Sequence, residues 1–332
     1  MWDNPFSNRR VGAGLVPPLL LFVFCLLPFN FPIAQTPSRL AVIDLLGDRG
    51  SEIASLLRAS AREDKTEKLE LIDEDLTRVA ARGSGYTGNL NLSRDEARAL
   101  GQSLGCDFYI LGKVQVTRRL VTSEQFYAEA LAGIFIVEAR TGRLINFVFE
   151  RAQKQSEQEA YQRLKESIKS GWQRYAQAII SAREKHLSEI EEIAQVRPPA
   201  KEIFSDETEA KGLQQPFFYE RLKPAYTEQA DLAGITATVE LEAVFGEDGR
   251  VGDVEVVKWA GYGLDESAIA TVRMLRFKPA ERDGKRLTFR GLVRYNFRRP
   301  LSQAVQPQAQ NQEDLERLKQ NLRDVLNPGR KP

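Results

Sequence analysis

The sequence predicts an α+β protein of two domains. It has an N-terminal α/β sandwich-like domain, a long charged helix, and a small C-terminal α+β domain with a three-stranded antiparallel sheet and two helices. Three observations lead to this expectation. The chain has 332 residues, a usual length for two domains. Apolar runs alternate with helical spacing before residue 150, and strands of alternating polarity follow residue 215. Between them, residues 153–195 contain no proline and are dense in charge.

Residues 1–35 have the pattern of an export signal. Arg9 and Arg10 precede an uncharged stretch with a densely apolar centre, and the small residue Ala34 lies near its end. This order is typical of a secretory signal peptide. Residues 11–33 are also long enough to remain as an inner-membrane anchor, although four prolines oppose a regular helix. Both interpretations place the rest of the chain in the periplasm or elsewhere in the cell envelope.

Residues 39–150 carry the pattern of an α/β domain. The run at residues 40–46, apolar except for Asp44, is typical of a strand buried on both faces. The segment Ser93-Arg94-Asp95-Glu96 has the form of a capping box, so it predicts the start of a helix that ends near Gly105. The other predicted elements are a helix at 51–61, a strand at 69–72, a helix at 73–81, and strands at 108–116, 126–138 and 144–149.

Residues 153–195 place apolar side chains at intervals of three and four. This spacing predicts one long amphipathic helix, or two helices with a break near Gly171. A helix of about forty residues would extend roughly 60 Å and would serve as a spacer between the domains. Its aromatic residues either pack on the first domain or form a ridge for a partner; they are Tyr161, Trp172 and Tyr175.

A polar linker at residues 196–214 leads to the second domain, residues 215–299. Asp265 is expected to cap the main helix of this domain. Asp248-Gly249 predicts a two-residue hairpin turn, because glycine accepts positive φ, and Asp283-Gly284 predicts another turn. Residues 300–332 form a polar tail with a short helix. The predicted elements of the domain are strands at 237–245, 251–258 and 287–297 and a helix at 266–275.

Several motifs of this second domain occur in an order that resembles the TonB C-terminal domain family. They are Ala233-Gly234-Ile235-Thr236-Ala237-Thr238-Val239, Gly246-Glu247-Asp248-Gly249-Arg250-Val251, Gly263-Leu264-Asp265-Glu266-Ser267-Ala268-Ile269, Arg276-Phe277-Lys278-Pro279-Ala280 and Val293-Arg294-Tyr295-Asn296-Phe297. The chain departs from the family at Thr227, where proline is usual, and at Ala237, where glycine is usual. The resemblance implies a periplasmic interaction module whose exposed sheet edge pairs with a short segment of an outer-membrane transporter.

The closing strand at residues 287–297 is the candidate for this edge. The alternative is that it is ordinary sheet whose outward arginines only discourage aggregation. Residues 258–299 hold eleven Lys or Arg and four Asp or Glu, a net charge of +7. This charge either attracts acidic peptides, anionic lipid head groups or cell-wall polymer, or belongs to a solvated face. The residues expected to bind the partner are Tyr226, Arg290, Leu292, Arg294 and Asn296.

Residues 39–150 are similar, at lower specificity, to TolB amino-terminal and CsgG-like envelope domains. The shared pattern is a helix ending in Leu104-Gly105-Cys106-Asp107, a strand ending in Gly112, and a turn at Thr141-Gly142. This resemblance implies an α/β module of envelope assemblies, and no chemistry follows from it.

The residue inventory argues against catalysis and against a cofactor. With one histidine and two cysteines, the chain cannot build a Cys-based zinc cluster or a site that needs two histidines. Cys106 is expected to be a small buried residue. The run from Gly83 to Gly88 has the letters GxGxxG, but it follows a predicted helix, so it is a loop. A net charge of +1 gives no support to nucleic-acid binding.

The sequence therefore predicts a non-enzymatic protein of the cell envelope, with no cofactor and no nucleic-acid partner. It would act as a TonB-like energy transducer, driven by an inner-membrane motor complex, or as a periplasmic adaptor. Its partner would be an outer-membrane transporter or another envelope protein. The alternative is a structural scaffold that forms a homo-oligomeric envelope assembly.

Overall fold

The computed structural model describes residues 37–64, 66, 68–120, 126–195, 204–205 and 212–300. The expected leader at residues 1–35, most of the linker predicted at 196–214 and the tail after residue 300 lie outside the described residues. Within this part of the chain the structure is α+β, as predicted. None of the described helices is long and apolar enough to cross a membrane.

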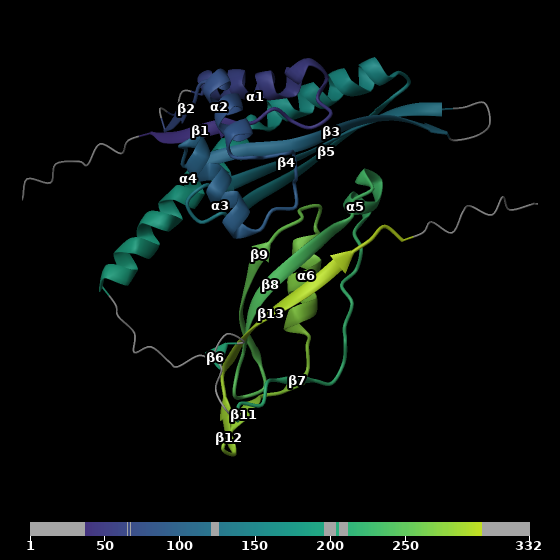
Figure 1. Cartoon of the computed structure of the whole chain (residues 1–332). Helices are drawn as coiled ribbons and strands as arrows, with labels where there is room; N and C mark the ends of the chain where they lie inside the picture. Colours follow the sequence, from purple (N-terminus) through teal and green to yellow (C-terminus); the bar gives the residue numbers. More distant parts are fainter. Residues whose placement is uncertain are drawn as a thin grey trace, which may run out of the picture. The chain divides into compact units, whose positions relative to one another are not determined.

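The N-terminal half is built on a mixed five-stranded sheet (Figure 1). Its strand order is β2 (Leu69–Leu71), β1 (Ser38–Val42), β3 (Phe108–Leu120), β4 (Phe126–Glu138) and β5 (Leu144–Lys154). β1 pairs in parallel with β2 and β3, whereas β3, β4 and β5 pair antiparallel. The strand predicted at 40–46 ends early, but the N–H groups of Ile43 and Leu46 still donate to carbonyls of β3.

Helices α1 (Glu52–Arg62) and α4 (Glu157–Gln195) cover one face of this sheet (Figure 1). α4 runs through Gly171 without a break, so the single long helix is confirmed. Trp172 and Tyr175 are buried in the core beneath α4, which confirms that these aromatic residues pack on the first domain. The apolar side chains of α4 from Ala160 to Ile179 lie against the sheet of the N-terminal half, so this part of the helix does not act as a free spacer.

The opposite face of the sheet carries α2 (Glu74–Gly83) and α3 (Arg94–Leu104). The predicted capping box starts α3. Ser93 Oγ accepts the N–H of Glu96 at 3.2 Å, and the Glu96 carboxylate accepts the N–H of Ser93 at 2.7 Å. Gly105 ends the helix with a φ of 63°. The GxGxxG-like run follows α2 and continues as turns and coil, as predicted.

The C-terminal half contains the predicted three-stranded antiparallel sheet and two helices, α5 (Glu228–Ala233) and α6 (Leu264–Arg273). A two-residue strand extends this sheet in parallel at one end. The strand order is β6 (Phe204–Ser205), β13 (Phe289–Phe297), β8 (Ala237–Phe245) and β9 (Val251–Lys258). β8 alternates between buried and half-buried residues, and its buried side chains form the centre of this core.

The predicted turn at Asp283-Gly284 is confirmed. Both residues have positive φ, 51° and 75°, as a two-residue hairpin turn requires. The turn joins β11 (Ala280–Arg282) to β12 (Lys285–Leu287). Thr288 separates β12 from β13 and is buried, so the closing strand begins at Phe289, two residues later than predicted.

Two local expectations are wrong. The loop at Asp248-Gly249 is longer than two residues, since the N–H of Gly246 donates to the carbonyl of Arg250 across it. The Asp248 carboxylate favours this longer loop, because it accepts the N–H of Arg250 at 3.0 Å. Asp265 does not cap α6. The capping residue is Gly263, with a φ of 74°, and Asp265 lies in the first turn.

The two halves share one apolar core. Trp259 and Tyr262, which follow β9, lie against Phe135 of β4 and Phe147 of β5. The ring centroids are 5.3 Å apart for Phe135 and Trp259, and 4.7 Å apart for Phe147 and Tyr262. Direct packing of this loop on the sheet therefore joins the halves, where the sequence suggested a helical spacer.

Asn91 adds a polar joint beside this core. Its side-chain amide donates to the carbonyls of Thr238 at 2.8 Å and Trp259 at 2.6 Å. Its side-chain oxygen accepts the N–H of Thr238 at 2.9 Å. One side chain thus satisfies backbone groups at the ends of β8 and β9 that would otherwise lack a partner in the sheet.

Candidate partner-binding edge

The predicted binding residues of the closing strand share one face of β13. Arg290, Leu292, Arg294 and Asn296 alternate with residues of the opposite face and are exposed. The alternate residues, such as Phe289 and Phe297, are buried against the C-terminal core. The structure therefore brings four of the five predicted residues together on one solvent-facing surface.

Three of these four side chains contact β8. Arg290 donates to Glu242 at 3.2 Å and Arg294 donates to Glu240 at 2.7 Å. Asn296 Oδ1 accepts the hydroxyl of Thr238 at 2.8 Å. Leu292 lies between the two arginines and is 51% exposed. The arginine charges are thus paired within the sheet, and the apolar Leu292 is the open part of this face.

Tyr226 lies apart from the exposed face. Its hydroxyl is 2.5 Å from the carbonyl of Ile235 and 3.1 Å from that of Ala230. Burial raises the pKa of the Tyr226 hydroxyl above its ordinary value. The side chain holds the turn between α5 and β8. Its role in the structure is to support this turn, separately from the four exposed residues of β13.

The two edges of the C-terminal sheet differ. β13 pairs with β8 over nine consecutive residues without a register shift. β9 has two register shifts along β8, and its end bridges Ser93 of the N-terminal half through Lys258. Such irregularities and covering contacts protect an edge from pairing with another chain. β13 is therefore the regular edge of this sheet.

Part of the β13 edge already holds a strand. β6 pairs in parallel with Phe289 and Arg290 only. Beyond that point, no described strand pairs with residues 291–297 on the side away from β8. β13 thus pairs with a parallel strand at its start. Among the described residues, the rest of this edge is not paired with a strand.

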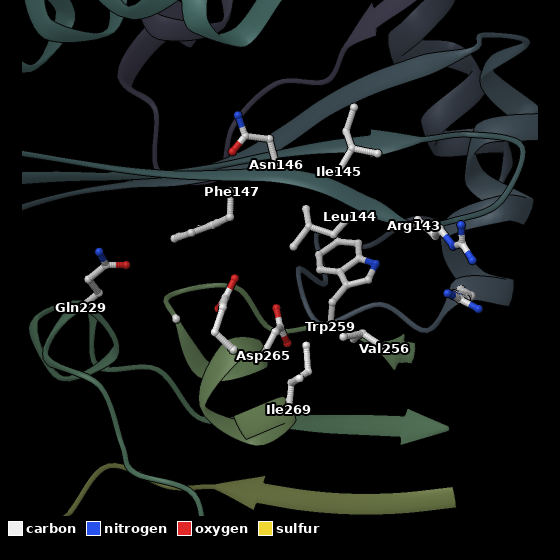
Figure 2. A pocket seen from close by; sticks show the side chains of 13 residues that line it. Arg143, Leu144, Ile145, Asn146, Phe147, Gln229, Val256, Trp259, Asp265 and Ile269 are labelled. Atoms are coloured by element: carbon white, nitrogen blue, oxygen red, sulfur yellow. The ribbon is translucent and has the colours of Figure 1, made fainter. Parts of the chain in front are cut away.

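A cleft of about 570 Å³ lies between β5 and α6 (Figure 2), and the sequence reasoning missed it. Figure 2 shows Leu144 and Phe147 of β5 facing Trp259, Asp265 and Ile269. Its residues come from three separate parts of the chain, at 94, 143–147 and 229–269, so no local spacing could have identified it. Of the residues that line it, Asp265 was expected only to cap a helix.

The carboxylate of Asp265 is hydrogen-bonded to the backbone of the loop that precedes α6. It accepts the N–H groups of Ala260 at 2.9 Å and Gly261 at 2.8 Å, and the residue is 6% exposed. Burial raises the pKa of this carboxyl to about 7, although the two backbone hydrogen bonds act against the increase. These contacts hold the loop that carries Trp259 and Tyr262 onto the N-terminal sheet.

Glu255 of β9 pairs with two arginines at the rim of the cleft. Arg94 lies 2.9 Å and Arg143 2.7 Å from its carboxylate oxygens. Burial would raise the pKa of Glu255, but the hydrogen bonds from both arginines outweigh it and hold the pKa below its usual range. Two arginines of the N-terminal half thus form ion pairs with one strand of the C-terminal sheet.

The described residues offer little reactive chemistry. Cys106 is half-buried, and burial raises the pKa of its thiol to about 12, which keeps it protonated. No group of three or more His, Cys, Asp or Glu among the described residues could hold a metal ion.

Comparison with known proteins supports the assignment of the C-terminal half. Residues 223–298 match the family model described as the Gram-negative bacterial TonB protein C-terminal, which confirms the resemblance drawn from the motifs. A comparison with curated proteins finds no match.

Solved structures with some similarity to the chain include three from bacterial proteins. The Pseudomonas aeruginosa TonB C-terminal domain is 19% identical, covers 30% of this chain and 95% of that chain, and has a TM-score of 0.24. Lipoprotein GNA1162 from Neisseria meningitidis is 14% identical, with 42% and 99% covered and a TM-score of 0.31. LpoB from E. coli is 15% identical, with 37% and 59% covered and a TM-score of 0.27.

Proposed function

We propose that this chain is a non-enzymatic protein of the cell envelope that acts as a TonB-like energy transducer or a periplasmic adaptor. Its C-terminal half binds an outer-membrane transporter, or another envelope protein, by adding a strand of that partner to β13. An inner-membrane motor complex drives the protein if it acts as a transducer. The family match over residues 223–298 supports this role.

The regular, open edge of β13 is the observation that carries the proposal. Residues 291–297 keep their register with β8, and no described strand covers their other side. An added strand gains one row of backbone hydrogen bonds, which give affinity without demanding a particular sequence. Leu292 offers an apolar contact to the incoming strand's side chains, while the arginines on either side remain paired to β8.

The shared core supports a mechanical role for the N-terminal half. A partner that pulls on β13 acts on β8, and β8 is tied to the N-terminal half through Asn91. The rings of Trp259 and Tyr262 add apolar contacts across the same interface. A load on the edge therefore passes into the five-stranded sheet, as an adaptor or transducer requires.

Proline substitution at the edge tests this binding mode. Consecutive N–H groups of a strand point to opposite sides, so of Leu292 and Val293 one faces β8 and the other faces the open edge. Proline is placed at each position in the full chain, and the variant that keeps the native circular-dichroism spectrum carries the test, because an edge-facing proline is tolerated. Capture of the partner from envelope extracts should fall at least about ten-fold if strand addition supplies most of the affinity.

Asp253→Pro on β9 is the matched control, since this exposed residue lies on the other edge strand. It should leave capture unchanged. If the folded β13 variant captures the same protein in the same amount as the natural chain, strand addition at this edge is wrong. A discrete homo-oligomer by light scattering, with no captured partner, would favour the scaffold instead.

A further inference from the structure

A small ribbon on the C-terminal half presents aromatic side chains to solvent. β7 (Phe217–Phe218) pairs antiparallel with β10 (Phe277–Lys278), so that Phe218 lies opposite Phe277 and Phe217 opposite Lys278. Phe218 and Phe277 pack with Phe245 of the core, at centroid distances of 5.1 Å for Phe218 and Phe245 and 5.1 Å for Phe277 and Phe245. One face of the ribbon is therefore anchored in the domain.

The other face of the ribbon points away from the core. Because side chains alternate along a strand, Phe217 and Tyr219 share this outer face. Their rings lie 5.9 Å apart, and they are 64% and 62% exposed. The backbone N–H of Tyr219 donates to the carbonyl of Arg276 at 3.1 Å, which sets the two segments side by side. Met274, just before this point, is 62% exposed.

Cations accompany these apolar groups. Arg276 and Lys278 are exposed on the segment paired with Phe217 and Tyr219. Among the described residues no acidic side chain forms an ion pair with Arg276, whereas Lys278 lies 3.2 Å from Glu281. Segments 216–223 and 273–281 together hold five Lys or Arg and two Glu, so their net charge is 5 − 2 = +3.

We propose that this surface, the aromatic–basic ribbon formed by Phe217, Tyr219, Met274, Arg276 and Lys278, binds the surface of a membrane containing anionic phospholipid. Exposed aromatic rings with a polar edge are favourable at the boundary between head groups and acyl chains. Adjacent Lys and Arg side chains are attracted to the negative surface potential of anionic lipids. β7 precedes residues 223–298, so the aromatic strand of the ribbon lies outside the part of the chain that matches the family model.

Exposed rings beside an excess of cations also distinguish this surface from the β13 face. There the arginines are neutralised by Glu240 and Glu242, and the open apolar group is a single leucine. The ribbon instead combines two rings, a methionine and a net positive charge at one place. Lipid binding by the ribbon therefore does not depend on strand addition at β13.

A tryptophan introduced at position 219 reports on this binding directly. Tyr219→Trp is made in the full chain together with Trp2→Phe, so that the leader contributes no tryptophan signal. The other two tryptophans, Trp172 and Trp259, are buried. On vesicles of phosphatidylcholine with phosphatidylglycerol, emission from the introduced indole should shift to shorter wavelength and be quenched by brominated acyl chains. Pure phosphatidylcholine vesicles should produce neither change.

Charge reversal provides the second arm. Arg276→Glu with Lys278→Glu, added to the reporter variant, should weaken the fluorescence response on the order of ten-fold or more, because each cation near an anionic surface contributes independently. These variants keep residues 1–36, so any attachment of the leader to vesicles is the same in both proteins. Leu76→Trp on α2, an exposed apolar position of the N-terminal half, is the matched control and should not respond.

Four outcomes would overturn the proposal. They are an emission from the introduced indole that anionic vesicles leave unchanged, an equal response to neutral vesicles, a response to protein concentration without lipid, and a response to polyglutamate but not to vesicles. The third would indicate a second copy of the chain, and the fourth an acidic protein partner. None of them bears on capture of a partner by β13, so failure here is separable from failure of the proposed function.

Discussion

At the scale of single residues, the joint between the halves depends on polar side chains that satisfy backbone groups. Asn91 bridges the ends of β8 and β9, and Asp265 accepts two N–H groups of the loop after β9. Both side chains bond to backbone groups where a strand begins or ends, and these groups would otherwise be unsatisfied donors or acceptors. Hydrogen bonds of this kind mainly stabilise the conformation of the loop, and they contribute less to binding another molecule.

Asp265 makes the stability of the fold depend on pH. Its pKa is about 7 in the folded protein and 3.8 ordinarily, so between these values the folded chain keeps a proton that the unfolded chain has released. The contribution of Asp265 to stability is therefore greatest below pH 3.8 and falls as pH rises to about 7. Asp265→Asn keeps an acceptor without the charge. Relative to the natural chain it should gain roughly 1 kcal/mol in unfolding free energy per pH unit across this window.

Urea unfolding measured across that range checks this expectation. Glu266→Gln is a second test, because the Glu266 carboxylate contributes to the raised pKa of Asp265 and its removal should narrow this pH window. A pH-independent difference for Asp265→Asn would mean that the carboxyl titrates near its ordinary value in the folded protein.

At the scale of elements, the N-terminal sheet is shaped to receive the loop after β9. Gly133 in β4 has no side chain, and Tyr262 lies over this gap. A Cβ at position 133 would clash with the Tyr262 hydroxyl oxygen and would lie 2.9 Å from the ring carbon that bears it. On β4, the ring of Phe135 contacts Tyr262, and Gly133 leaves the space that the Tyr262 side chain occupies.

Gly133→Ala should therefore destabilise the fold by about 1–3 kcal/mol, the usual cost of overpacking a core. Chemical unfolding measures this loss. Gly252→Ala is the matched control, because a Cβ there would lie 3.6 Å from its nearest neighbour and the change should stay within about 0.5 kcal/mol. Adding Tyr262→Phe to Gly133→Ala removes the oxygen that the new methyl group meets and should recover part of the loss. No recovery would place the clash elsewhere.

At the scale of the whole described chain, one apolar cluster runs from α2 and α3 through the N-terminal sheet into the C-terminal sheet. A second cluster, beneath α1 and α4, belongs to the N-terminal half alone. Two parts that share a core of this kind are expected to unfold together, since exposing one part strips apolar contacts from the other. Transmission of force from β13 would use the same contacts.

Trp259→Ala should separate the two unfolding events. Calorimetry of the natural chain should show one transition, and this variant should show two, because one of the two loop rings that join the halves is lost. Trp172→Ala is the matched control: it removes a buried tryptophan from the cluster beneath α4 and should lower the midpoint while keeping one transition. Two transitions in the natural chain, or one in Trp259→Ala, would contradict coupling through this loop.

Local chemistry alone determined many elements of this protein. The Ser93 capping box, the alternation of residues 237–245, the turn at Asp283-Gly284 and the long helix each depend on residues close in sequence. The family motifs of the second domain are likewise contiguous, and the model match over residues 223–298 confirms them.

Only the tertiary structure decided how these elements meet. It placed α4 against its own sheet, directed the Asp265 carboxylate to the loop after β9 instead of to a helix cap, and set Phe217 beside Lys278 on an exposed ribbon. The contacts between the halves join residues separated by more than 100 positions, as between Asn91 and Trp259. Hydrophobic periodicity states that a face will be buried, but the burial itself is non-directional, so the pattern cannot say which partner covers that face.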